Sequence, residues 1–131
     1  MSRAVAIEVS HLGKTYEKVR AVDDLSFQVY AGEIFGLLGP NGAGKSTTLR
    51  ILITLLHPTS GSATILGMDS VKDADRVRKT IGYVPQERAI DRFLTGREHL
   101  ELLADLYHLS PEDASTRIPQ LLKLVELEQQ A

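Results

Sequence analysis

Residues 38–48 read Leu-Gly-Pro-Asn-Gly-Ala-Gly-Lys-Ser-Thr-Thr, and this stretch decides the fold. It contains the pattern Gly-x-x-x-x-Gly-Lys-Ser, whose fixed positions are Gly39, Gly44, Lys45 and Ser46. The apolar run before it, residues 33–38, is typical of a short buried strand. The residues after it, 47–56, place apolar side chains at helical spacing, namely Leu49, Leu52, Ile53 and Leu56. We therefore expect a strand, a glycine-rich turn and a helix start, in that order.

This turn has the chemistry of a phosphate-binding loop. Its glycines allow positive φ and a close approach of the backbone to a ligand, and the helix start adds N–H groups and a dipole. The residues expected to bind a nucleotide's phosphates are Gly39, Pro40, Asn41, Gly42, Ala43, Gly44, Lys45, Ser46 and Thr47. Lys45 is expected to reach the β- and γ-phosphates, and the Ser46 hydroxyl to hold Mg²⁺. The flanking strand and helix disfavour the alternative, a turn that caps a helix and binds nothing.

The composition is that of an ordinary globular chain of at most one domain. Its 131 residues are 43% hydrophobic and 24% charged, with a formal net charge of −2. A broad nucleic-acid interface usually needs a basic excess, so we expect no nucleic-acid partner. The chain has no cysteine, which excludes disulfides and thiolate zinc sites. The longest apolar run, 51–56, is far shorter than the ~20 residues of a membrane span, so any membrane link should come through a partner.

The rest of the pattern predicts a mixed α/β front half followed by a helical tail. Further strands are expected at 4–9, 25–30, 62–66 and 81–84. The short spacing between 25–30 and 33–38 favours an antiparallel hairpin of these two strands. A first helix is expected at 70–79. A second should begin after Thr95, which forms a capping box with Glu98, and a third should begin at Ser110, with Pro111 in its first turn. Pro119 is expected to kink or restart this last helix.

The run that begins at Ala31, Ala-Gly-Glu-Ile-Phe-Gly-Leu-Leu-Gly-Pro-Asn-Gly-Ala-Gly-Lys-Ser-Thr, resembles the Walker A region of ATP-binding-cassette (ABC) ATPases. Tyr16 and residues 81–86, Ile-Gly-Tyr-Val-Pro-Gln, are further matches. Residues 94–100, Leu-Thr-Gly-Arg-Glu-His-Leu, resemble the subgroup that powers drug and antibiotic exporters of the daunorubicin-resistance type. The resemblance covers essentially the whole chain.

The resemblance implies an α/β fold, the N-terminal part of an ABC nucleotide-binding domain of the P-loop nucleoside triphosphatase class. That part comprises an antiparallel β subdomain, the phosphate-loop strand and helix, and the start of the helical subdomain. Residues 1–86 would form the nucleotide-binding core with the β subdomain, and residues 87–131 the Q-loop and the start of the helical subdomain. Together these segments make one partial domain.

The resemblance also implies roles for two residues outside the loop. Tyr16 matches the aromatic residue that stacks on adenine, although its position alone also fits an ordinary half-exposed tyrosine at a strand end. Gln86 matches the Q-loop glutamine, which touches Mg²⁺ and the attacking water and couples the site to a permease. Lys45 and Gln86 are therefore the expected catalytic positions, Ser46 and Gln86 the expected metal contacts, and ATP with Mg²⁺ the expected ligands.

The sequence departs from the family pattern because three motifs are missing. A working cassette also carries a Walker B strand that ends in Asp-Glu, a Ser-Gly-Gly-Gln signature and a switch histidine, and none of these occurs in the 131 residues. Residues 124–126 come nearest to a Walker B, but they lack the aspartate. We therefore expect the N-terminal half of a cassette, which binds ATP–Mg²⁺ weakly without appreciable turnover. A strand at 33–38 would lack neighbours, so we also expect an unstable or aggregation-prone chain.

The resemblance implies two macromolecular partners, an integral membrane permease and a second cassette in a homodimer or heterodimer. The location would be cytoplasmic, peripheral at the inner face of the membrane. Residues 87–94 and the helix after Thr95 would meet the permease, or else form a solvated loop and a helix packed on its own domain.

The alternative function is a non-catalytic nucleotide-binding fragment or regulatory remnant. A small kinase or GTPase is disfavoured by Tyr16, by the paired strands and by the absence of Asn-Lys-x-Asp.

Overall fold

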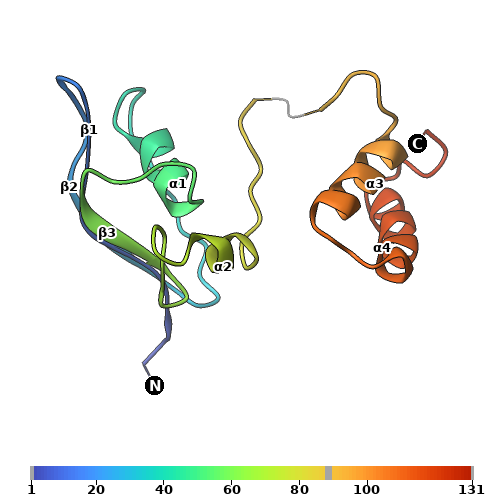
Figure 1. Cartoon of the computed structure of the whole chain (residues 1–131), viewed down its shortest axis with the longest axis horizontal. Coiled ribbons are helices and arrows are strands. Elements are labelled where there is room, and N and C mark those ends of the chain that lie inside the picture. The colour runs from blue at the N-terminus through green and yellow to red at the C-terminus, as the bar shows by residue number, and fades with distance from the viewer. Residues whose placement is uncertain (1, 88–89, 131) are drawn as a thin grey trace. The chain divides into compact units, whose positions relative to one another are not determined.

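The computed structural model describes residues 2–87 and 90–130. The chain divides into two compact units, residues 1–83 and residues 84–131. The first unit holds all the strands and two helices, and the second unit holds two further helices among its described residues (Figure 1). The phosphate-loop sequence lies in the first unit.

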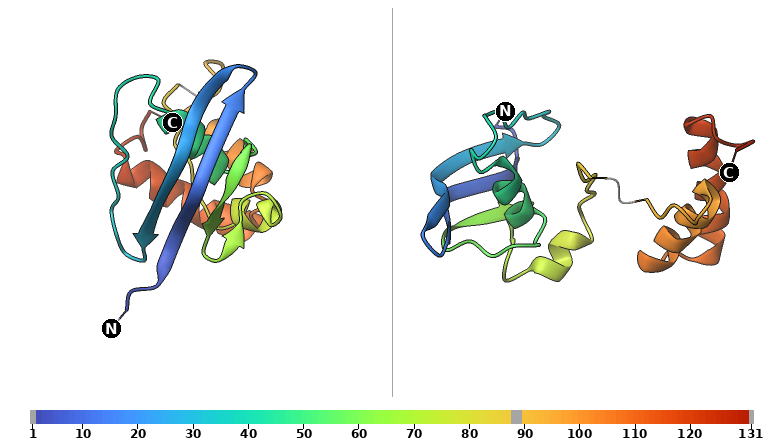
Figure 2. Two further views of the ribbon diagram at one scale, coloured as in Figure 1. Left: turned by 90° about the vertical axis from the view of Figure 1, so that its left-hand side faces the viewer. Right: turned by 90° about the horizontal axis from the view of Figure 1, so that it is seen from above.

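The first unit is built on an antiparallel sheet of four strands in the order β2-β1-β3-β4. The strands are β1 (Val5–Tyr16), β2 (Val19–Tyr30), β3 (Ser60–Ile65) and β4 (Met68–Asp69). β1 and β2 form a long hairpin in which Tyr16 pairs with Val19, and β3 lies along the other edge of β1 (Figure 2). The hairpin predicted between 25–30 and 33–38 is therefore wrong: in the described part of the chain β2 pairs with β1, its other edge stays open, and residues 33–38 form no strand.

The core lies between this sheet and α1 (Lys45–Leu52), with Val77 of α2 (Ala74–Arg78) closing it (Figure 1). Its fully or nearly buried members are Val9, Leu12, Val22, Ile51, Leu52, Ala63, Ile65 and Val77. The predicted strand at 25–30 forms as part of β2, where Val29 is buried while Ser26 and Gln28 are exposed. The packing of apolar side chains on both sides of this core holds α1 against the sheet.

The apolar stripe predicted for α1 is only partly right. The helix buries Thr48, Ile51 and Leu52 against the sheet, whereas Leu49 is exposed. The helix begins at Lys45, directly after the loop, and it packs on β3 and β2 with Thr48, Ile51 and Leu52 on its buried face. The spacing of the leucines could not show which face of the helix is buried, because Thr48, which is buried, counts as polar in the pattern.

The strand predicted at residues 33–38 does not form in the described structure, and neither does the strand at 81–84. An extended segment becomes a strand only by hydrogen bonding to a neighbour, and no described segment pairs with either one. The 33–38 segment is held at its start, where the Glu33 carboxylate accepts the Tyr30 N–H at 2.8 Å, and by stacking of Phe35 on Phe27 at 5.0 Å between ring centroids. Beyond these contacts, Ile34 and Leu38 are almost completely exposed.

The second unit packs α3 (Gly96–Leu106) against α4 (Pro111–Leu124) around Ala104, Ile118 and Leu122. The predicted capping box is confirmed: the Thr95 hydroxyl accepts the Glu98 N–H at 3.2 Å, and the Glu98 carboxylate accepts the Thr95 N–H at 2.8 Å. Ser110 caps α4, with Pro111 in its first turn as expected. α4 continues through Pro119 as one helix, so the predicted restart is wrong. Ile118 and Leu122 are buried on both sides of the proline and hold the turn in place.

Candidate nucleotide-binding site

The loop that precedes α1 adopts the glycine-dependent shape that its sequence predicts. Gly42 and Gly44 have φ values of 85° and 88°, in the left-handed region. The Ala43 N–H donates to the Pro40 carbonyl at 3.1 Å and closes the turn between them. Gly44 then ends the loop as the N-cap residue of α1. The backbone therefore turns sharply where the helix begins.

Gly44 also sits where a side chain would not fit. A Cβ at this position would lie 2.3 Å from the Ala21 carbonyl oxygen and 3.1 Å from a methyl group of Val22. The loop therefore packs directly against the backbone of β2, and only glycine permits both this contact and the positive φ. By contrast, a Cβ at Gly42 would meet nothing within 4 Å.

The N-terminus of α1 is available to an anion. Gly44 has no side chain to cap the helix, and the first turn contains no acidic residue. The first N–H groups of a helix have no partner within the helix, and the helix dipole adds positive charge at this end. Lys45 and Ser46 start the helix, with Lys45 half-buried and Ser46 exposed. A phosphate group would thus meet backbone N–H groups, an ammonium and a hydroxyl.

The Lys45 side chain folds back over the loop. Its ammonium donates to the carbonyl oxygens of Gly39 and Pro40, the latter at 2.9 Å. Both acceptors are neutral carbonyls, which bind an ammonium more weakly than an anionic oxygen does. The ammonium therefore lies at the loop with partners that a phosphate can replace.

Thr48 is a structural residue of the site that the sequence analysis did not single out. Its hydroxyl and its N–H both donate to the Gly44 carbonyl, at 2.8 and 2.9 Å, and it is almost completely buried. It thereby locks the first turn of α1 onto the end of the loop. The sequence could have indicated this role, because Thr48 lies four residues after Gly44, the spacing at which a threonine hydroxyl donates to a helix carbonyl.

Tyr16 lies at the end of β1, on the hairpin next to β2, and keeps 42% of its surface exposed. Its ring has a charged neighbour, because the Lys14 ammonium lies 5.2 Å from the ring centroid. Gln86 is exposed and belongs to the second unit, whereas the loop belongs to the first. The structure therefore brings the loop residues together, and the roles of Tyr16 and Gln86 in nucleotide binding stay predictions.

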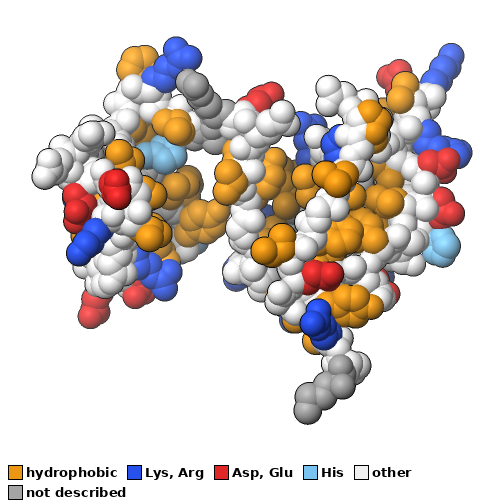
Figure 3. All heavy atoms as spheres, turned by 180° about the vertical axis from the view of Figure 1, so that it is seen from behind, with side chains coloured by type: hydrophobic (Ala, Val, Ile, Leu, Met, Phe, Trp, Pro, Cys, Tyr) orange, Lys and Arg blue, Asp and Glu red, His pale blue; other side chains and the backbone are white. Residues whose placement is uncertain are grey.

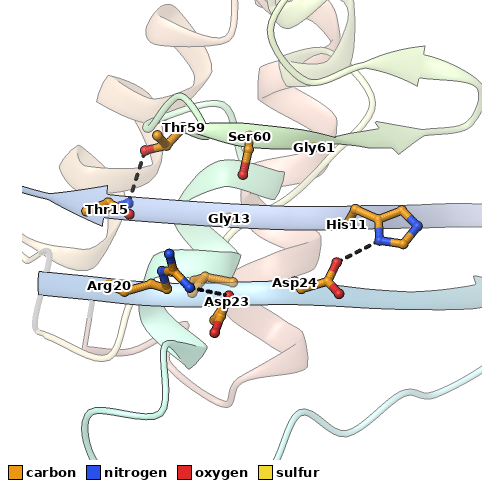
Figure 4. A pocket seen from close by; sticks show the side chains of 10 residues that line it. His11, Gly13, Thr15, Arg20, Asp23, Asp24, Thr59, Ser60 and Gly61 are labelled. Carbon is orange, nitrogen blue, oxygen red and sulfur yellow. Dashed lines mark hydrogen bonds and ion pairs between the residues drawn. The ribbon is translucent and has the colours of Figure 1, made fainter.

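A polar hollow of about 480 Å³ lies over β1, β2 and the start of β3 (Figure 4). Its charged side chains form pairs, His11 with Asp24 at 2.6 Å and Arg20 with Asp23 at 3.0 Å. Ser60 points over Gly13, and Thr15 donates its N–H to the Thr59 hydroxyl at 3.0 Å. The sequence analysis did not predict this hollow. It adjoins the strand end that carries Tyr16, but none of the phosphate-loop residues lines it.

Two further properties concern only residues 2–87 and 90–130. In that part of the chain, no three histidine, aspartate or glutamate side chains gather in a way that could hold a metal ion. Its helices are all too short or too polar to cross a membrane.

The comparisons with known proteins agree with this geometry. Residues 22–131 match the family described as ABC transporter. The chain is 45% identical, over 117 residues, to the daunorubicin/doxorubicin resistance ATP-binding protein DrrA of Streptomyces peucetius, covering 89% of this chain and 36% of that protein. It is 42% identical to the Nod factor export ATP-binding protein I of Sinorhizobium fredii, covering 97% of this chain and 37% of that protein. The chain thus spans little more than a third of the length of these relatives.

Solved structures show the same fold. The ATP-binding subunit of an ABC transporter superposes with a TM-score of 0.81 at 35% identity, over 95% of this chain and 52% of that one. A dimeric ATP-binding cassette in a post-hydrolysis state, bound to ADP and phosphate, superposes with a TM-score of 0.77 at 30% identity, over 94% of this chain and 58% of that one. The predicted fold class, the N-terminal part of a P-loop ABC nucleotide-binding domain, is confirmed.

Proposed function

This chain belongs to the ABC transporter family, and we propose that it binds ATP with Mg²⁺ as the nucleotide-binding part of an exporter. The observation that carries the proposal is the uncapped start of α1, reached through left-handed glycines and overlaid by the Lys45 ammonium. A polyphosphate fits this set of donors, because several N–H groups and one cation face the same point.

Each loop residue then has a task. On binding, the Lys45 ammonium exchanges the Gly39 and Pro40 carbonyls for phosphate oxygens, which carry negative charge. The backbone N–H groups that the loop and the first turn of α1 leave unpaired would bind the phosphates, while Gly44 keeps the loop seated on β2. The exposed Ser46 hydroxyl supplies a hard oxygen ligand for Mg²⁺, which neutralises phosphate charge when bound. Tyr16 would stack on the base, and in the complete protein Gln86 would contact Mg²⁺ and the attacking water.

The family and the relatives' names support the wider role. Two of the relatives are named for drug resistance and Nod factor export, and one of the similar cassettes is dimeric. We propose that the complete protein pairs with a second cassette and with a membrane permease, on the cytoplasmic side of the membrane, and exports a small drug-like substrate. The face toward the permease comprises residues 87–94, of which 88 and 89 lie outside the described residues, and α3.

Replacing Lys45 tests nucleotide binding. Lys45→Ala should abolish measurable binding of ATP–Mg²⁺ in isothermal titration calorimetry, because it removes the one side-chain cation at the loop. Arg50→Ala is the matched control: it removes a cation from the last turn of the same helix and should leave affinity unchanged. Equal losses in both variants would contradict a specific phosphate site. Tripolyphosphate, which has no base, tests the role of the base: ATP should bind more tightly than this ligand if Tyr16 stacks on adenine.

The permease face can be tested by cross-linking, because the chain has no cysteine of its own. Phe93→Cys places a single thiol on a highly exposed position of the segment 87–94, and Val19→Cys places one at the exposed start of β2 as a control. In membrane vesicles from the source cells, a bifunctional maleimide should link only Phe93→Cys to an integral membrane protein. Equal cross-linking from both positions would contradict the assignment of this face.

We further propose that these 131 residues bind ATP without appreciable turnover. No Asp-Glu pair and no Ser-Gly-Gly-Gln motif occurs in them, so the carboxylate that orients water and the contacts from a second cassette have no counterpart here. A phosphate-release assay should give the same background rate for the native chain and for Lys45→Ala. Steady phosphate release that depends on Lys45 would refute this proposal.

A further inference from the structure

Lys14 places a positive charge beside the ring of Tyr16. The two residues lie two positions apart at the end of β1, where the pairing with β2 is irregular. The Lys14 ammonium lies 5.2 Å from the centroid of the Tyr16 ring. This distance is within the roughly 6 Å over which the face of an aromatic ring attracts a cation.

The ammonium is also held from a second side. It donates to the His57 carbonyl oxygen at 2.8 Å, and His57 lies in the connection between α1 and β3. Two neighbouring bonds reinforce this link, from the Thr59 N–H to the Gly13 carbonyl at 2.8 Å and from the Thr15 N–H to the Thr59 hydroxyl at 3.0 Å. Three consecutive residues of β1, 13–15, are thereby tied to the segment that follows the phosphate-loop helix.

We propose that Lys14 is a positioning residue for the nucleotide base: it covers one face of the Tyr16 ring and leaves the other face for adenine. This inference rests on the proposed function, in which Tyr16 stacks on the base. Lys14 restricts the ring before the nucleotide arrives, so less conformational freedom is lost on binding. Tyr16 itself keeps 42% of its surface exposed, which supports a ring face that stays accessible. Lys14 thus raises affinity through the base and contributes nothing through the phosphates.

The decisive experiment compares a ligand that has a base with one that has none. The affinities of ATP–Mg²⁺ and of tripolyphosphate–Mg²⁺ are measured by calorimetry on the full chain and its variants. Lys14→Met keeps the length of the side chain but loses the charge and the bond to His57. It should weaken ATP binding about two- to fivefold, the loss expected for one cation–π contact at an exposed site, and leave tripolyphosphate unchanged. Lys14→Arg keeps the charge and should restore ATP affinity.

Two controls separate this role from general electrostatics. Lys18→Met removes an exposed lysine from the turn after Tyr16 and should change neither affinity. On a Tyr16→Ala background, Lys14→Met should have no further effect, because its partner is already gone. An equal loss for both ligands would overturn the proposal, as would tighter ATP binding by Lys14→Met, which would mean that the lysine occupies the place of the base.

The outcomes distinguish this inference from the function on which it rests. If Tyr16→Ala weakens ATP binding and Lys14→Met does not, only the inference fails. If Tyr16→Ala does not weaken ATP binding more than tripolyphosphate binding, the stacking role and the inference fail together. A nucleotide-free measurement tests the geometry itself: the Lys14 ε-methylene protons should show an upfield ring-current shift in NMR spectra that disappears in Tyr16→Leu. Absence of this shift in the native chain would overturn the inference.

Discussion

At the scale of single residues, the phosphate loop depends on one glycine more than on the others. Gly42 and Gly44 have almost the same left-handed φ, but only Gly44 lies against the β2 backbone. The sequence pattern marks Gly44 as fixed and Gly42 as variable, which agrees with this difference. The fixed glycine of the pattern therefore reflects a steric contact as well as a backbone angle.

Alanine at these two positions should destabilise the chain by different amounts. Gly42→Ala meets only the cost of left-handed backbone, about 1–2 kcal/mol. Gly44→Ala adds the clash with the Ala21 carbonyl, and overpacking of this kind costs typically 1–3 kcal/mol more. Urea unfolding followed by circular dichroism gives both losses. If the two variants lost the same stability, β2 would not be the support of the loop.

At the scale of elements, the capped helix starts are what the sequence predicted best. Each signal occupies a few consecutive residues: the predicted capping box of Thr95 and Glu98 forms at the start of α3, and α4 begins at Pro111 as predicted, with Ser110 as its N-cap. The face that an element buries was predicted less well, as α1 shows. Capping is a local matter of backbone donors and one side chain, whereas the buried face depends on where the rest of the chain places the helix.

The capping box of α3 should make its stability depend on pH. The Thr95 N–H and hydroxyl hold the pKa of the Glu98 carboxyl below its ordinary value. A carboxyl with a lowered pKa in the folded state stabilises that state at neutral pH, and this contribution disappears as the pH falls through the lowered pKa. Helicity followed by circular dichroism from pH 7 to pH 3 should therefore fall more in the native chain than in Glu98→Gln.

Glutamine can make the same reciprocal hydrogen bonds but does not titrate over this range, so Glu98→Gln isolates the charge. Glu101→Gln, an exposed glutamate of the same helix, serves as the control and should keep the native pH dependence. Asp69 in the first unit has a pKa lowered by the Lys72 and Val71 N–H groups, and supplies a residual dependence in all variants. An identical response of Glu101→Gln and Glu98→Gln would contradict the role of the capping box.

At the scale of the whole molecule, the main feature is an apolar segment without strand partners. Residues 33–38 have the composition of a buried strand, yet Ile34 and Leu38 are 101% and 92% exposed. Exposed hydrophobic side chains also gather elsewhere on the surface (Figure 3). An extended apolar segment with unpaired backbone is a template for pairing with another chain.

The 131-residue chain should therefore self-associate through this segment. Ile34→Lys places a charge on the exposed segment and should shift the sedimentation profile in analytical ultracentrifugation toward monomer. Leu124→Lys is the matched control, since it changes an exposed leucine at the end of a helix and should leave association unchanged. A native chain that is a monodisperse monomer and unfolds cooperatively on heating would contradict the prediction.

The sequence by itself determined the phosphate loop, the helix caps and the family, because each depends on residues that are close together in the chain. A positive φ needs glycine, an N-cap needs a hydroxyl, and a phosphate needs N–H groups and a cation, whatever lies further away. Only the tertiary structure decided which face of α1 is buried, that β2 pairs with β1, and that residues 33–38 stay unpaired. It also brought Lys14 to the His57 carbonyl. These outcomes depend on contacts between distant segments, and the pattern along one segment does not contain its partners.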